Sequence, residues 1–91
     1  MAENNTQQLR LPPQSIEAER AVLGCMLIDN KSVPKAMHHL KVQSFYKSAH
    51  ATIFENMMNL FEKNEAIDNI SLIEQLKKSN QLDAVGGAYY I

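Results

Sequence analysis

Apolar residues recur at three- and four-residue steps through much of the chain, which is the spacing of a helix with one buried face. The first such stretch begins after Pro12 and Pro13, which hold the chain before it extended. Ser15 can cap a helix here, and Glu17 and Glu19 favour the positive end of its dipole. We therefore expect a first helix whose buried face is Ala18, Ala21, Val22, Cys25 and Met26, widened by Leu23 and Leu27.

Two more helices are predicted before residue 64. Asp29 and Asn30 end the first helix and can cap a second one that runs to about Leu40, with Pro34 tolerated in its first turn. Its apolar face is Val33, Met37 and Leu40, which leaves His38 and His39 mostly outside. Ser44 is expected to cap a short turn in which the rings of Phe45 and Tyr46 anchor the loop on the core. Ser48 then caps a central helix that ends near Lys63 and buries Ile53, Phe54, Met57, Leu60 and Phe61.

The last third of the chain predicts a fourth helix and one further turn. Asn64 can close the central helix in the left-handed conformation, and Ile67 followed by Asp68 places a hydrophobic residue before a cap. Leu72, Ile73 and Leu76 form the buried stripe of the fourth helix, which carries Lys77 and Lys78 near its end and stops at Asn80. Gly86 and Gly87 open a last helical turn over residues 88–91. No persuasive alternation of a strand occurs, so we predict an all-α fold.

The composition and net charge limit the classes of function that this chain can have. The 91 residues suffice for one small domain, predicted as a flexible tail over residues 1–13 and a helical head over 14–91. Nine Lys and Arg against ten Asp and Glu give a net charge of −1, which argues against direct DNA binding. The single cysteine, Cys25, is expected to be a buried hydrophobe, which fits a reducing cytoplasm. The start of the chain lacks an export signal, and no apolar run is long enough for a membrane helix.

Chemical motifs are few. No glycine-rich phosphate loop with its lysine is present, and Gly86-Gly87 is interpreted as a turn, so no cofactor site and no catalytic residue are predicted. His38, His39 and His50 do not make a convincing metal site, because adjacent helix residues diverge by about 100° and no acid or cysteine completes the set. His50 is expected to pack or hydrogen-bond in the first turn of the central helix. Met57 and Met58 are interpreted as core and core-edge residues.

A set of motifs identifies the family. Ser15-Ile-Glu-Ala-Glu-x-Ala-Val-Leu-Gly24 is followed in order by Asp29, Phe45-Tyr46, Ala49-His50, Ile53-Phe54, Ile67-Asp68, Leu82 and Val85-Gly86-Gly87-x-x-Tyr90. This pattern, over residues 11–91, resembles the N-terminal domain of the DnaB-type replicative DNA helicases. The resemblance implies a compact orthogonal bundle of about four to six short helices. It also implies that the family's helical hairpin, linker and ATPase domain, which follow this part, are not present here.

The resemblance carries expectations about function. In the family this domain helps to arrange six subunits in a ring and offers a surface to primase and, in some lineages, to a helicase loader. ATP, Mg²⁺ and DNA contacts belong to the missing parts, so the fragment is expected to be a non-enzymatic, mainly monomeric interaction domain. Glu17 and Tyr90 are the candidate partner-binding residues: a carboxylate that can meet a basic surface, and an aromatic that can anchor an interface. Glu17 can also serve only the helix dipole.

Two other classes of function stay open at this point. A free-standing helical adaptor or regulator could use the same surfaces outside replication. A small helical enzyme is disfavoured, because no paired catalytic groups are found.

Overall fold

The structure, a computed structural model, describes residues 15–87. Within this range the chain forms four α-helices, two short 3₁₀ helices and no strand: α1 (Ile16–Ile28), α2 (Ser32–His39), η2 (Val42–Ser44), α3 (Ser48–Glu62), α4 (Asn69–Lys78) and η3 (Asp83–Val85). The predicted all-α class is therefore confirmed. The predicted tail over residues 1–13 and the predicted last turn over residues 88–91 lie outside the described residues.

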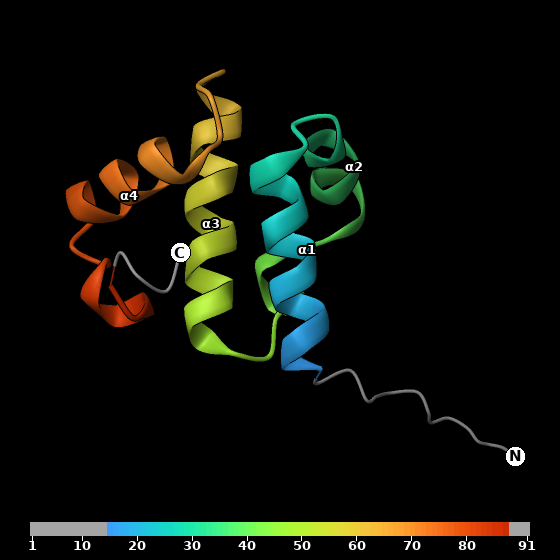
Figure 1. The fold of residues 1–91 in the computed structure, drawn as a ribbon, viewed down its shortest axis with the longest axis horizontal. Helices are drawn as coiled ribbons and strands as arrows, with labels where there is room; N and C mark the ends of the chain where they lie inside the picture. The colour runs from blue at the N-terminus through green and yellow to red at the C-terminus, as the bar shows by residue number, and fades with distance from the viewer. Residues whose placement is uncertain (1–14, 88–91) are drawn as a thin grey trace, which may run out of the picture.

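The helices pack around α3. Figure 1 shows α1 and α3 side by side with their N-termini at the same end, at the bottom of the view. α4 crosses the other side of α3 at a large angle, and α2 lies against α1. Two helix N-termini therefore meet at one end of the domain, and each carries the partial positive charge of unpaired amide groups.

The core is apolar and centred on α3. Phe54 and Met57 are fully buried there, and the rings of Phe54 and Phe45 lie with their centroids 4.9 Å apart. The remaining buried apolar side chains come from α3 itself and from the other helices and loops: Leu23, Met26, Val33, Ile53, Leu60, Ile67, Leu72, Leu76 and Val85. Met58 lies at the edge of this cluster, as predicted. Phe61 was also predicted to be buried, but 38% of its surface is exposed.

The helices around α4 begin and end at the capping residues that were predicted from the sequence. The Asp68 carboxylate accepts a hydrogen bond from the Ser71 amide at 2.8 Å, and the Ser71 hydroxyl accepts one from the Asp68 amide at 3.0 Å, which makes a capping box. Asn64 and Asn80 are both left-handed, with φ of 58° and 59°. Each follows the C-cap of its helix, and the paired amide-to-carbonyl bonds of a Schellman motif surround it.

The prediction for the buried face of the first helix was right for Met26 and Leu23 but wrong for its other main members. Ala18, Ala21 and Cys25 are exposed and Val22 is 37% exposed, whereas the face toward the core carries Leu23, Met26 and the acid Glu19. Apolar residues occupy nearly every side of this helix, so their spacing alone could not identify the buried side.

Four predicted caps or anchors in the loops also differ. Ser48 is the first residue of α3 and not its cap: the N-cap is Lys47, which makes no side-chain capping bond. The Ser44 hydroxyl bonds the Lys41 amide and so starts η2 rather than the turn after it. Phe45 is buried as predicted, but Tyr46 is 67% exposed. The side chain of Asp29 bonds the Lys31 amide, and α2 begins without a side-chain cap.

Candidate partner-binding site

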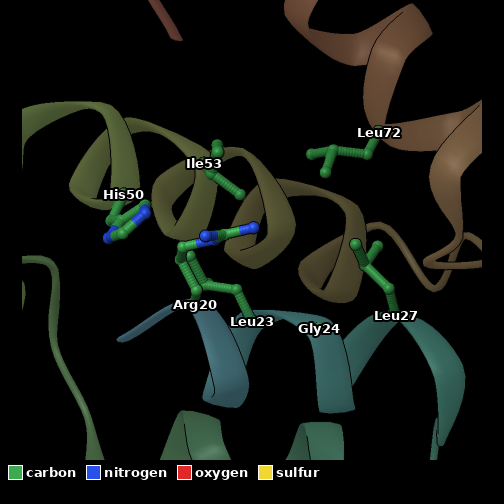
Figure 2. Close-up of a pocket in the computed structure, with 7 residues that line it drawn as sticks. All are labelled: Arg20, Leu23, Gly24, Leu27, His50, Ile53 and Leu72. Atoms are coloured by element: carbon green, nitrogen blue, oxygen red, sulfur yellow. The ribbon is translucent and has the colours of Figure 1, made fainter. Parts of the chain in front are cut away.

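The side of α1 that faces α3 and α4 borders a hollow of about 180 Å³. Figure 2 shows its walls: Leu23 and Leu27 rise from α1, Ile53 comes from α3 and Leu72 comes from α4. Gly24 leaves one part of the α1 wall bare, and Arg20, which is exposed, rises from α1 beside Leu23. The site is thus a mostly apolar hollow whose lining also includes Arg20 and His50.

Two glutamates near the start of α1 have opposite environments. Glu17 is exposed, whereas only 7% of the surface of Glu19 is exposed. Ser15 caps the helix as predicted, since its hydroxyl oxygen accepts a hydrogen bond from the Ala18 amide at 3.1 Å. The helix start is therefore well defined, and Glu17 is held in its first turn on the surface.

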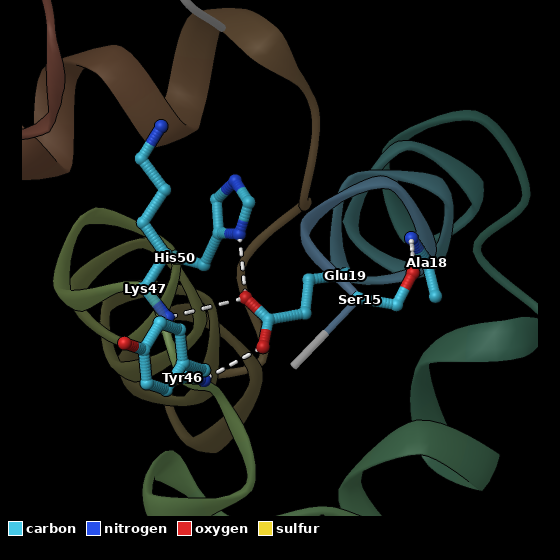
Figure 3. A network of polar contacts seen from close by, with 6 residues as sticks. All are labelled: Ser15, Ala18, Glu19, Tyr46, Lys47 and His50. Carbon is cyan, nitrogen blue, oxygen red and sulfur yellow. Dashed lines mark hydrogen bonds and ion pairs between the residues drawn. The ribbon is translucent and has the colours of Figure 1, made fainter. Parts of the chain in front are cut away.

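Glu19 joins the start of α1 to the start of α3. Figure 3 shows its carboxylate accepting hydrogen bonds from the Tyr46 amide at 2.6 Å and from the Lys47 amide at 3.4 Å. The Nδ1 atom of His50, a fully buried residue in the first turn of α3, lies 2.8 Å from the same carboxylate. An ionised carboxylate can only accept, so Nδ1 carries the proton of this bond.

The electrostatics of this junction favour the ionised acid. Burial of the Glu19 carboxyl raises its pKa, but the hydrogen bonds from the Tyr46 amide, the His50 imidazole and the Lys47 amide outweigh that effect. The pKa of Glu19 therefore lies below its ordinary value of 4.5. Because the carboxylate lies at the N-terminal ends of both α1 and α3, it also meets the positive ends of two helix dipoles.

The other residues predicted for chemistry or binding are placed as follows. His50 hydrogen-bonds in the first turn of the central helix, as predicted. His38 and His39 are exposed at the end of α2, with their rings edge to face. No three His, Cys, Asp or Glu side chains between residues 15 and 87 come together as a possible metal-binding group. Tyr90 lies outside the described residues.

The role of Glu19 was not predicted from the sequence. A signal was present, because Glu19, Leu23 and Met26 share one helical face, and an acid in such a row is buried only with partners. Its partners, however, lie 27 to 31 residues away along the chain, so no local pattern names them.

Comparison with known proteins gives the family. Residues 11–91 match the family model described as the DnaB-like helicase N terminal domain. The chain belongs to this family. It is 40% identical over 90 residues to the replicative DNA helicase DnaB of Treponema pallidum, and 38% identical over 82 residues to that of Rhodothermus marinus. These alignments cover 97% and 90% of the chain.

The fold of the DnaB-like domain is shared with a solved structure. The crystal structure of the N-terminal domain of DnaB helicase from Mycobacterium tuberculosis superposes with a TM-score of 0.82 at 30% sequence identity. The match covers 88% of this chain and 56% of that one. The chain spans only 20% of the length of the Treponema relative and 9% of the Rhodothermus relative. Each helix within residues 15–87 is too short or too polar to cross a lipid bilayer.

Proposed function

We propose that this DnaB-like domain is a protein-interaction and ring-assembly domain of a replicative hexameric DNA helicase. Its partners would be primase, other helicase subunits and, in some settings, a helicase loader, all in the cytoplasm. The observation that carries the proposal is the family match over residues 11–91, together with curated relatives that are replicative DNA helicases. A free-standing adaptor is the alternative, and the same alignment with long helicases disfavours it.

The junction of α1 and α3 supports a binding role for Glu17. The bonds of Glu19 to the Tyr46 amide and to His50 fix the start of α1 against the start of α3. Glu17, two residues earlier, is exposed on that fixed helix, so ordering its backbone adds little to the free energy cost of binding. An exposed carboxylate in such a place suits a basic group on a partner.

The test is a titration of matched primase C-terminal domain against a full-length helicase that carries this domain. Glu17→Lys should weaken binding, because it replaces attraction by repulsion, while the fold loses only the dipole contribution of about 0.3–1 kcal/mol. Glu55→Lys makes the same charge change at an exposed position on α3 and serves as the control. Tyr90→Ala tests the second candidate residue in the same assay.

Binding that is unchanged in both Glu17→Lys and Tyr90→Ala would remove these residues from the interface. Binding that falls equally in Glu55→Lys would point to a general charge effect. Circular dichroism of each variant must show that the helices persist.

ATP hydrolysis and DNA unwinding, with ATP and Mg²⁺ as cofactors, are assigned in this proposal to a separate ATPase domain. The 91-residue chain by itself should therefore show no ATP turnover above a mock preparation, and it should sediment mainly as a monomer. Measurable turnover by the purified chain would contradict the assignment.

A further inference from the structure

A second hollow lies along another side of α1, away from Gly24. It measures about 250 Å³, and its apolar walls are Ala18 and Val22 of α1, Leu40 at the end of α2 and Phe45 after η2. Ala18 is exposed and 37% of the surface of Val22 is exposed, although their spacing predicts a buried face. Within residues 15–87 this row of apolar side chains therefore has no complete cover. We call the site the Val22 hollow.

The Val22 hollow offers mainly apolar contact to an occupant. Its three polar lining residues, Ser15, Glu19 and Ser44, already have hydrogen-bond partners. The hydroxyl groups of Ser15 and Ser44 each accept a bond from a backbone amide three residues away. The Glu19 carboxylate accepts bonds from two amides and lies 2.8 Å from Nδ1 of His50. An occupant should therefore be apolar, and it needs no charged group.

The residues that precede α1 begin at the edge of this hollow. Ser15, the first described residue, caps α1 and lines the hollow, and its backbone is extended, with φ of −85° and ψ of 101°. Leu11 stands four residues earlier, so an extended chain lets it reach up to about 13–14 Å from Ser15. Val22 lies seven residues along the helix, roughly 10 Å away by the rise of an α-helix. Leu11 can therefore reach the hollow.

The sequence of this segment suits the hollow. Leu11, Pro12 and Pro13 are all apolar, and a residue before a proline prefers extended backbone. Each proline has a fixed φ, so ordering the segment loses less conformational entropy than ordering an ordinary one. The family match begins at residue 11 rather than at the helix, which places these residues within the domain that the relatives share. Leu9, by contrast, lies before the matched range.

We propose that residues 11–13 form a strap over the Val22 hollow, with the Leu11 side chain packed on Val22 and Phe45. The strap covers the apolar side of α1 that residues 15–87 leave exposed, and it limits the predicted tail to residues 1–10. The inference goes beyond the proposed function and does not rest on it. It makes the Val22 hollow part of the domain's own core rather than a site for a partner protein.

The experiment uses the 91-residue chain, isotope-labelled, in nuclear magnetic resonance. Nuclear Overhauser contacts are expected between the methyl groups of Leu11 and both the Phe45 ring and the methyl groups of Val22. The methyl groups of Leu9 should show no such contacts. Absence of the Leu11 contacts under conditions in which the core contact of Phe45 with Phe54 is seen would overturn the proposal.

Unfolding in urea measures how much the strap stabilises the domain. Leu11→Ser should raise the unfolding equilibrium constant about three- to tenfold, the effect of exposing roughly half of a leucine side chain. Leu9→Ser makes the same chemical change two residues earlier and should alter the constant by about twofold or less. Equal effects of the two substitutions would overturn the proposal.

A double substitution tests whether Leu11 contacts this hollow and no other surface. Leu11→Ser and Val22→Ala remove two sides of one contact, so their combined effect on the unfolding constant should be smaller than the product of the separate effects. Ile70→Ala, at an exposed residue of α4 that does not line the hollow, is the control and should multiply with Leu11→Ser. Independent effects of Leu11→Ser and Val22→Ala would overturn the placement on Val22.

The hollow of a second copy of the chain is the competing site for the strap. A mixture of labelled and unlabelled chains decides this, because isotope filtering selects contacts between different molecules. Contacts from Leu11 of a labelled chain to the Phe45 ring of an unlabelled chain would assign the strap to a neighbouring copy and overturn the proposal. The primase titration with Glu17→Lys does not depend on any of these results, so this inference and the proposed function can fail separately.

Discussion

The two sides of α3 are built differently. Toward α4 the contact is mainly apolar: Leu72 and Leu76 of α4 are fully buried, and α3 and α4 share more contacts than any other pair of helices. The buried Asn56 side chain of α3 adds a polar contact there, because it donates a hydrogen bond to the Gln81 side chain at 3.0 Å. Toward α1 the contact depends at one end on the Glu19–His50 pair, and farther along it leaves a hollow beside Gly24. The difference indicates that the contact of α3 with α4 stabilises the fold, whereas the contact of α3 with α1 leaves part of the protein surface accessible.

Polar and apolar contacts also respond to different conditions. The stability of a closed apolar contact depends on how completely its side chains fill the available volume, because removal of a methylene group leaves a cavity. The stability of the contact through Glu19 depends on the protonation state of the Glu19 carboxyl group, because its three hydrogen-bond partners favour the ionised form as acceptor. Substitutions and changes of pH should therefore affect the two sides differently.

The largest effect is expected in the apolar core of α3. Phe54→Ala should lower the free energy of unfolding by about 3–5 kcal/mol, because Phe54 has no exposed surface and its ring packs against Phe45. Such a loss is comparable to the whole stability of a small domain. Urea unfolding followed by circular dichroism measures it. Phe61→Ala, which removes a ring that is 38% exposed on the same helix, should lose clearly less. Equal losses would show that the buried face of α3 is misassigned.

A smaller loss is expected on the polar side. Glu19→Gln keeps the shape but removes the charge, and it leaves the Tyr46 amide, the Lys47 amide and His50 with a weaker acceptor. Unfolding free energy should fall by about 1–3 kcal/mol. The matched change Glu17→Gln, two residues away on the surface, should cost less than about 1 kcal/mol. If both changes have the same effect in urea titrations, the Glu19 junction does not hold the two helices together.

The same junction predicts a pH dependence. The pKa of Glu19 in the folded chain lies below 4.5, so the unfolded chain takes up this proton first as the pH falls. The stability contributed by the carboxylate is thus present above pH 4.5 and is lost as the pH falls through the lower folded-state pKa. One such proton gives a slope of at most about 1.4 kcal/mol per pH unit.

Glu19→Gln should flatten this slope when unfolding free energy is measured from neutral pH down to about 3. Part of the slope should remain, because hydrogen bonds from the Ser71 amide and hydroxyl lower the pKa of Asp68 below 3.8 as well. An unchanged slope in the Glu19→Gln variant would assign the acid sensitivity to other groups.

The features that could be predicted from the sequence also differ between the two sides of α3. Around α4 the deciding contacts are local: Asp68 and Ser71 bond each other over three residues, and Asn64 and Asn80 end helices through bonds of five residues or fewer. Such helix-capping motifs can be recognised from residues that are close together in the sequence. The class of fold and most of the core of α3 were therefore predictable.

Around α1 the deciding contacts are long-range. Apolar residues lie on most sides of this helix. The side that is buried is the one on which Glu19 contacts His50, which lies 31 residues later in the chain. Periodicity placed Val22 and Cys25 inside, and Glu19 was interpreted only as a partner of the helix dipole, because a sequence pattern shows the type of each side chain and not its contacts. The hollow beside Gly24 was not predictable for the same reason, since its walls come from three helices.

The smallest effect tests whether the α1 side is open in solution. Gly24→Ala should raise the free energy of unfolding by about 0.4–1 kcal/mol, because alanine restricts the unfolded chain and its Cβ meets nothing within 4 Å. Gly87→Ala is the matched control: its Cβ also meets nothing, but the backbone there is left-handed at φ 83°, so the same change should destabilise the domain. Urea midpoints at one pH measure both. A loss of stability in Gly24→Ala would mean that the hollow closes on this glycine in solution. The reason for the missing Cβ would then be internal packing, and the two sides of α3 would be alike.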